Sequence, residues 1–187
     1  MAKVHFFYST MNAGKSTALL QSAHNYHETG NETILFIPRE DAERNSGLIK
    51  SRIGLSASAI VIDSKLKIFE YVQKEVEKRK IDAILVDEAQ FLKKHHVLQM
   101  CKICDELEIP VMCYGIRTDF RGELFEGSGS LLALADNLIE LKTVCNECSK
   151  KATMVVRLDE NGKVVTKGSK VQIGGNDVYR VLCRKHF

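Results

Sequence analysis

The sequence of 187 residues contains no tryptophan, only two prolines, and no apolar run approaching the roughly 20 residues that a transmembrane helix requires. It also has no marked excess of one charge, because 27 basic and 24 acidic residues are intermingled and leave a net charge of +3. We therefore expect neither a membrane-spanning protein nor a strongly basic nucleic-acid-binding surface. The sequence shows no signal-peptide pattern, so we expect a cytoplasmic protein whose six cysteines are thiols or metal ligands.

Short apolar segments rich in β-branched and aromatic residues alternate with segments of helical spacing over the first three quarters of the chain. Such alternation predicts a doubly wound α/β fold, with a parallel sheet covered by helices on both faces. The expected strands are residues 4–8, 33–37, 59–62, 81–86 and 111–114, and the expected helices are residues 15–29, 66–79 and 91–107. Residues 38–58 are polar and lack clean periodicity, and we expect a long loop there.

A run of small and polar residues at positions 9–17 follows the first expected strand and leads into the first expected helix. In that context backbone N–H groups can surround a phosphate, Lys15 adds a positive charge, and the Ser16 hydroxyl can ligate Mg²⁺. The usual pattern G-x-x-x-x-G-K-[ST] has glycine where this chain has Ser9, so the match is partial. The alternative is a small-residue turn that caps a helix. The residues assigned to the phosphate-binding loop are Ser9, Thr10, Met11, Asn12, Ala13, Gly14, Lys15, Ser16 and Thr17.

An acidic pair, Asp87 and Glu88, ends the apolar segment 81–86. In phosphate-loop proteins an aspartate in this place orients the magnesium ion, and a second carboxylate can act as a general base. Adjacent residues of an extended strand point to opposite sides, so we expect the two carboxylates to perform different tasks. The alternative is an acidic pair at the N-terminus of the next helix, where negative charge is favourable.

Two ligand pairs lie near the end of the chain, Cys145 with Cys148 and Cys183 with His186. Three thiolates and one imidazole at these spacings are typical of tetrahedral structural zinc, and four protein ligands leave no open position for a substrate. We expect zinc to close the base of the long loop between the pairs. The alternative is a set of unpaired cysteines with a surface histidine.

A second pair, Cys101 and Cys104, has the same spacing but lies inside an expected helix among apolar residues. We expect these two thiols to pack in the core rather than to bind metal or form a redox pair.

Five separated motifs together resemble thymidine kinases of the zinc-containing cytosolic type, which bacteria also possess. They are the phosphate loop, the segment 86–91, the segment 115–122, the Cys/His quartet, and the segment 173–175 before Tyr179. The resemblance implies a RecA-like α/β domain at residues 1–141 and a zinc-tied lasso domain at residues 142–187. It implies a homotetramer that takes ATP, Mg²⁺ and structural zinc and has no nucleic-acid or membrane partner.

The implied reaction is ATP-dependent phosphorylation of the 5′-hydroxyl of thymidine in nucleotide salvage, with Glu88 as the catalytic base. The resemblance adds Asp87, Glu88, Ala89 and Gln90 to the ATP and magnesium site. Phe120 is expected to stack on the base, and backbone near Val171, Gln172 and Ile173 to bind the thymine edge. The remaining substrate residues implied are Met11, Asp41, Phe91, Ile116, Phe125 and Tyr179.

Two assignments stay open at this stage. Phe91 and Ile116 are equally compatible with core packing. Family members often have Asp-x-Arg after the second strand, whereas Asp41 here is followed by Glu43 and Arg44, so Arg44 and Arg52 are both candidates for phosphate contact. A nucleic-acid-dependent ATPase with a zinc module is the alternative function, and a non-catalytic nucleotide-binding regulator would not need Glu88.

Overall fold

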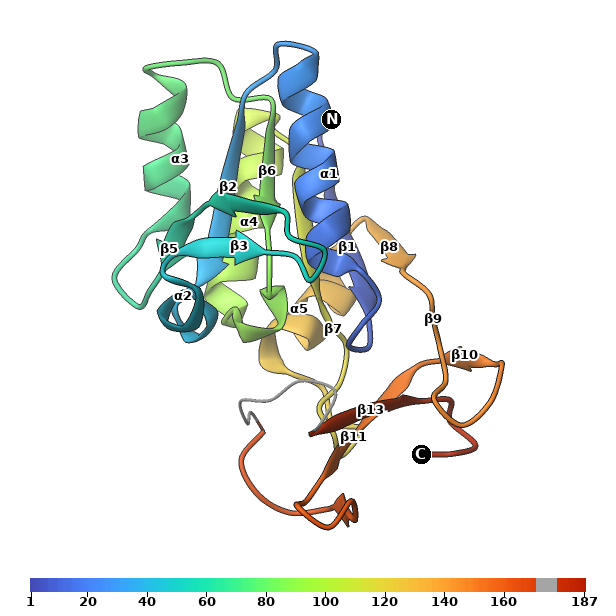
Figure 1. Ribbon diagram of the computed structural model, residues 1–187. Helices are drawn as coiled ribbons and strands as arrows, with labels where there is room; N and C mark the ends of the chain where they lie inside the picture. The colour runs from blue at the N-terminus through green and yellow to red at the C-terminus, as the bar shows by residue number, and fades with distance from the viewer. Residues whose placement is uncertain (171–177) are drawn as a thin grey trace.

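The computed structural model describes residues 1–170 and 178–187. Its centre is a six-stranded sheet in the order β5-β2-β6-β7-β1-β8, and every neighbouring pair runs parallel. Figure 1 shows this sheet between helices, with the C-terminal strands below it. The strands are β1 (Val4–Ser9), β2 (Thr33–Pro38), β5 (Ile60–Ile62), β6 (Ala83–Val86), β7 (Val111–Ile116) and β8 (Asn137–Glu140).

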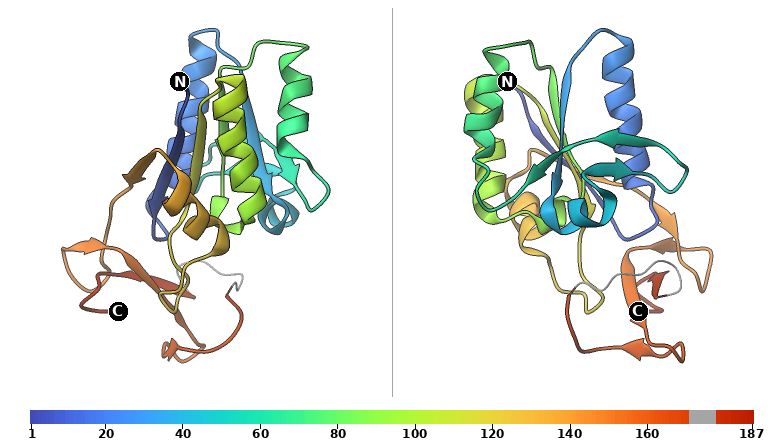
Figure 2. Two further views of the ribbon diagram at one scale, coloured as in Figure 1. Left: turned by 180° about the vertical axis from the view of Figure 1, so that it is seen from behind. Right: turned by 60° about the vertical axis from the view of Figure 1, so that its left-hand side comes forward.

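The two faces of the sheet bury two separate apolar clusters because successive strand residues point in opposite directions. In β2, Ile34 and Phe36 join one cluster and Leu35 and Ile37 join the other. The first cluster is covered by α3 (Ile68–Val76), α4 (Lys94–Leu107) and α5 (Glu126–Leu134), and the second by α1 (Lys15–Glu28). Figure 2 shows α1 on the opposite side of the sheet from α3 and α4. The predicted parallel α/β fold with helices on both faces is confirmed.

The C-terminal strands form two small antiparallel sheets beyond the phosphate-loop end of the main sheet (Figure 1). Their strands are β9 (Thr143–Val144), β10 (Lys151–Ala152), β11 (Met154–Leu158), β12 (Val164–Val165) and β13 (Tyr179–Leu182). The Thr10 hydroxyl donates a hydrogen bond to the Met154 carbonyl at 3.1 Å, which fastens the phosphate loop to β11. The domain boundary predicted after residue 141 falls between β8 and β9 and stays a prediction. Among the described helices, none is long and apolar enough to cross a membrane.

The prediction of a long loop at residues 38–58 was wrong. These residues contain α2 (Arg39–Asn45) and the antiparallel hairpin β3 (Leu48–Lys50) and β4 (Ser56–Ser58). Ile49 is fully buried in the cluster beneath α1 and anchors this hairpin. The elements were hidden because each is short and presents few apolar residues to the core.

The expected helix at residues 91–107 is two elements, the 3₁₀ turn η1 (Ala89–Phe91) and α4. Lys93 is extended, and its N–H donates to Nδ1 of His96 at 3.2 Å, so α4 begins one residue later. Sequence reasoning also missed α5, whose glycine and serine content lowers helix propensity. A Cβ at Gly127 would lie 2.4 Å from the Ala89 carbonyl oxygen, so close contact between α5 and η1 requires glycine there.

Candidate active site

The phosphate loop leaves the carboxyl end of β1 and enters α1 through two left-handed residues. Asn12 has φ of 60° and Gly14 has φ of 72°, and no side chain caps the N-terminus of α1 at Gly14. Ser9, which replaces the usual glycine, does not have positive φ, and its hydroxyl donates to the Leu141 carbonyl at 2.6 Å. Serine at this position therefore ties β1 to the end of β8 and imposes no strain on the loop.

Lys15 lies inside this loop, where its Nζ donates to the Thr10 carbonyl at 2.7 Å. Only 8% of the residue is exposed. Burial lowers the pKa of Lys15, while Glu88 and Asp87 raise it and Arg52 lowers it. The ammonium group thus lies among the acidic pair and a second cation, at the place where the sequence predicts phosphate binding.

Asp87 follows β6 and is nearly fully buried. Its Oδ1 has no hydrogen-bond partner among the described residues, while the Ser16 side chain hydrogen-bonds to the same carboxyl group. Burial and the neighbouring Glu88 raise the pKa of Asp87 to about 7. An unpartnered carboxylate oxygen beside a serine hydroxyl fits Mg²⁺, which prefers oxygen ligands.

Glu88 does not continue the strand, so the expectation that alternation along an extended strand separates the two carboxylates was wrong. Its backbone is left-handed, with φ of 48° and ψ of 38°, and it precedes η1 without capping it through its side chain. In this conformation the Glu88 side chain lines a cavity that is described below, and Gln90 donates a hydrogen bond to its Oε2.

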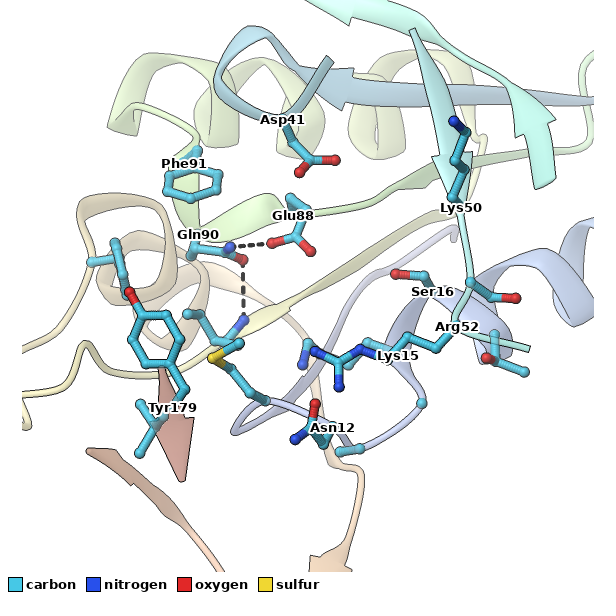
Figure 3. Close-up of a pocket in the computed structure, with 18 of the residues that line it drawn as sticks. Asn12, Lys15, Ser16, Asp41, Lys50, Arg52, Glu88, Gln90, Phe91 and Tyr179 are labelled. Atoms are coloured by element: carbon cyan, nitrogen blue, oxygen red, sulfur yellow. Dashed lines mark hydrogen bonds between the residues drawn. The ribbon is translucent and has the colours of Figure 1, made fainter. Parts of the chain in front are cut away.

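One cavity of about 720 Å³ joins the phosphate loop to the C-terminal strands. Figure 3 shows Phe91 and Tyr179 at one end, Lys15, Ser16 and Arg52 at the other, and Glu88 with Gln90 between them. The predicted residues that line it are Met11, Asn12, Ala13, Gly14, Lys15, Ser16, Thr17, Asp41, Glu88, Gln90, Phe91, Ile116, Phe120, Phe125 and Tyr179. Ser9, Thr10, Asp87 and Ala89 lie outside its lining. Val171, Gln172 and Ile173 lie outside the described residues.

The apolar end of the cavity is built from aromatic rings. Phe91 and Phe125 meet edge to face, with their centroids 5.8 Å apart. The Arg157 guanidinium lies 4.1 Å from the centroid of Phe120 and donates to the carbonyl oxygens of Lys167 at 2.9 Å and Ser169 at 2.8 Å. Arg157 was not predicted from the sequence, because its position in a C-terminal strand gave no sign of its contact with Phe120.

The hairpin after α2 brings polar residues to the phosphate end, where Lys50, Ser51, Arg52 and Ile53 line the cavity. Of the two arginines left open by sequence analysis, Arg52 thus reaches the site, and the side chain of Arg44 is outside the described part of the structure. The polarity of residues 38–58 was the feature of the sequence that could have indicated that this segment reaches the site. Other lining residues that sequence reasoning missed are Asn45, Asp119, Val155 and Lys170.

The four proposed metal ligands converge, and their ligand atoms all lie within 4.8 Å of one another. Nδ1 of His186 lies 3.6 Å from Sγ of both Cys145 and Cys183, and the Sγ atoms of Cys148 and Cys183 are 3.9 Å apart. Tetrahedral zinc bonds of about 2.3 Å to sulfur and 2.0–2.1 Å to nitrogen imply edges of roughly 3.6–3.8 Å. The cluster could therefore hold zinc.

The other cysteine pair has a different environment. Cys104 is buried in the α4 core, and burial raises its pKa to about 12. Cys101 packs at the edge of the same core, and burial raises its pKa as well. Both residues pack in or against this core, as expected for the pair.

The loop at the end of β1, the acidic pair after β6 and the cavity between them define a P-loop nucleotide-binding α/β protein. Comparison with known proteins narrows this class. The family model described as Thymidine kinase matches residues 2–187, so the chain belongs to the thymidine kinase family.

Similar curated proteins include the thymidine kinase of Zymomonas mobilis, 51% identical over 187 residues, which cover all of this chain and 96% of that protein. Those of Rhodopirellula baltica and Haemophilus influenzae are 50% identical over all of this chain and cover 88% and 96% of those proteins.

Proposed function

We propose that this chain transfers the γ-phosphoryl group of ATP to the 5′-hydroxyl of thymidine, giving thymidine monophosphate and ADP. Family membership supports the reaction class. The observation that carries the proposal for this site is the single cavity in which Glu88 lies between a phosphate loop and an aromatic wall (Figure 3).

At the phosphate end, the loop amides and Lys15 hold the phosphates of ATP. Asp87 and Ser16 hold Mg²⁺, which when bound neutralises charge on the transferring phosphoryl group. The Nζ of Lys15 leaves the Thr10 carbonyl to contact phosphate, because a phosphate oxygen is a stronger acceptor than a neutral carbonyl. These groups act mainly through position and charge.

At the centre of the cavity, Glu88 accepts the proton of the thymidine 5′-hydroxyl. The 5′-oxygen forms its bond to the γ-phosphorus as the bond between that phosphorus and the β,γ-bridging oxygen breaks, and ADP leaves. General-base catalysis of this kind contributes roughly 10²–10⁴-fold to the rate.

At the apolar end, Phe120 stacks on the thymine ring, and Met11, Phe91, Ile116, Phe125 and Tyr179 surround it. Phe91 and Ile116 both line the cavity, which favours ligand contact over pure core packing. Asp41 lines the cavity from α2 and is available to the deoxyribose.

Cys145, Cys148, Cys183 and His186 would hold a structural zinc ion, which would link the segment after β9 to the segment after β13. The cluster shares its apolar surroundings with Met11 of the phosphate loop. Through these ligands a bound zinc ion would help to position β13, and with it Tyr179, relative to the loop. The homotetrameric assembly and cytoplasmic location implied by the resemblance stay predictions.

The test is formation of ADP and nucleoside monophosphate from Mg-ATP with a panel of nucleosides, and separately with single-stranded DNA. We expect thymidine to give stoichiometric ADP and monophosphate, and DNA to leave ATP hydrolysis unchanged. Stimulation by DNA alone would instead support the nucleic-acid-dependent ATPase.

A further inference from the structure

We propose that Gln90 is the positioning residue for Glu88 and connects it to Ile116, which lines the apolar end of the cavity. This inference rests on the proposed role of Glu88 as the base. Gln90 is 2% exposed, and both ends of its amide are engaged. Its Oε1 accepts a hydrogen bond from the Ile116 backbone N–H at 3.1 Å, and its Nε2 donates to Oε2 of Glu88. Dashed lines in Figure 3 mark both bonds.

The orientation of this amide is set by its partners. The Ile116 N–H can only donate, so it selects the oxygen of Gln90. The nitrogen must then face Glu88, whose carboxylate can only accept. A rotated amide would place a donor against the N–H and an acceptor against the carboxylate, which costs both hydrogen bonds in a buried place.

Two glycine backbones pack closely against Gln90. A Cβ on Gly115 would lie 2.9 Å from Oε1 of Gln90 and 3.0 Å from its backbone nitrogen. A Cβ on Gly127 would lie 2.9 Å from the Gln90 carbonyl oxygen. The Ser128 hydroxyl donates to the Ile116 carbonyl at 2.6 Å, which holds the following peptide, between Ile116 and Arg117. Glycine at both positions lets the backbone approach Gln90 closely, and Ser128 helps to hold Ile116, the residue whose N–H orients the amide.

The consequence is a rigid connection between substrate recognition and the base. Ile116 lines the cavity, and its peptide holds the amide that holds the carboxylate of Glu88. Glu88 itself lies after the end of β6 and has a left-handed backbone, so the strand pairing between β6 and β7 does not include it. We assign to Gln90 the task of holding Glu88 at one distance from the nucleoside, instead of contact with ATP.

The test compares Gln90→Met, which keeps the length and removes both polar atoms, in the wild type and in the Glu88→Gln background. We expect kcat to fall roughly 10- to 100-fold in the wild type, because small misplacement of a catalytic group has costs of that order. The KM for ATP should stay within about twofold, since Gln90 acts on the base and not on the nucleotide. In the Glu88→Gln background the same substitution should change kcat by less than about twofold, because residues that act as a unit are not additive.

A second variant, Gln90→Glu, keeps the shape and the acceptor for the Ile116 N–H, but it replaces the NH₂ donor with a second carboxyl oxygen against Glu88, so that charge repulsion or a shared proton disturbs the base. It should also lower kcat, at an unchanged KM for ATP. The matched control is Gln99→Met, because Oε1 of Gln99 likewise accepts a backbone N–H, that of Phe69 at 3.2 Å, but lies outside the cavity lining. Its kcat should equal that of the wild type.

Three results would overturn the inference. They are unchanged kcat in both Gln90 variants, an equal loss of kcat with and without the Glu88 carboxylate, and a rise in the KM for ATP well beyond twofold. Failure of the proposed base is distinguishable, because Glu88→Gln alone would then retain near-normal kcat.

Discussion

Asp87 should make the stability of the ligand-free protein depend on pH. Its carboxyl group is buried, one oxygen lacks a partner among the described residues, and burial together with Glu88 raises its pKa from an ordinary 3.8 to about 7. The folded state therefore binds this proton more tightly than the unfolded state. The contribution of this proton to the free energy of unfolding is fully present below pH 3.8, and it is lost as pH rises through about 7.

Asp87→Asn removes the charge and keeps the shape. A pKa difference between 3.8 and about 7 corresponds to at most about 4 kcal/mol, since each pKa unit is about 1.4 kcal/mol. The variant should therefore gain stability relative to wild type as pH rises from about 4 to 8, up to that limit. Urea unfolding of both proteins at several pH values, without nucleotide or Mg²⁺, measures the difference.

The matched control is Asp119→Asn. Asp119 is also buried, but its Oδ1 accepts N–H groups of Arg121 and Glu123 and its Oδ2 accepts the Arg121 guanidinium. This substitution should destabilise the protein. If Asp87→Asn were equally destabilising at pH 8, the argument that the Asp87 charge lacks compensation would be refuted.

Three further predictions concern the two ends of the site. Lys15→Ala should lower kcat by roughly 10²–10³-fold, the loss typical of a charge-stabilising group, with thymidine binding by calorimetry retained; full activity with a lower Tm would favour a structural role. Cys145→Ser should release one zinc ion per chain by metal analysis and raise the KM for thymidine more than that for ATP; an unchanged thymidine KM would separate zinc from substrate recognition. Arg157→Met should weaken thymidine binding by roughly fivefold, about 1 kcal/mol, through loss of the cation contact with Phe120, and unchanged calorimetric affinity would contradict this.

The inner strands of the main sheet were predictable because they are buried on both faces, whereas the edge strand β8, whose residues are partly exposed, was not predicted. Segments such as β2 are apolar throughout, and buried parallel strands have this pattern. The loop after β1 and the Cys/His quartet were recognisable because phosphate binding and metal binding each require certain residue types at fixed spacing.

What the sequence did not reveal depends on contacts between distant segments. The hairpin that carries Arg52 is anchored by one fully buried residue, Ile49, which gives no periodic signal. The role of Arg157 follows from its contact with Phe120, which is 37 positions away in the chain. The role of Gln90 follows from its hydrogen bond to the Ile116 N–H, which only the folded structure reveals. The left-handed backbone of Glu88 likewise has no signature in its residue type.

The proposed mechanism depends most on Glu88 as the proton acceptor. Single-turnover phosphorylation of thymidine by excess enzyme tests it directly, with Glu88→Gln compared to wild type and to Glu32→Gln, an exposed carboxylate that pairs with Arg79 and lies outside the cavity lining. Glu88→Gln should slow the chemical step by roughly 10²–10⁴-fold while ATP and thymidine still bind, and Glu32→Gln should not slow it. A Glu88→Gln rate close to that of wild type would contradict the mechanism.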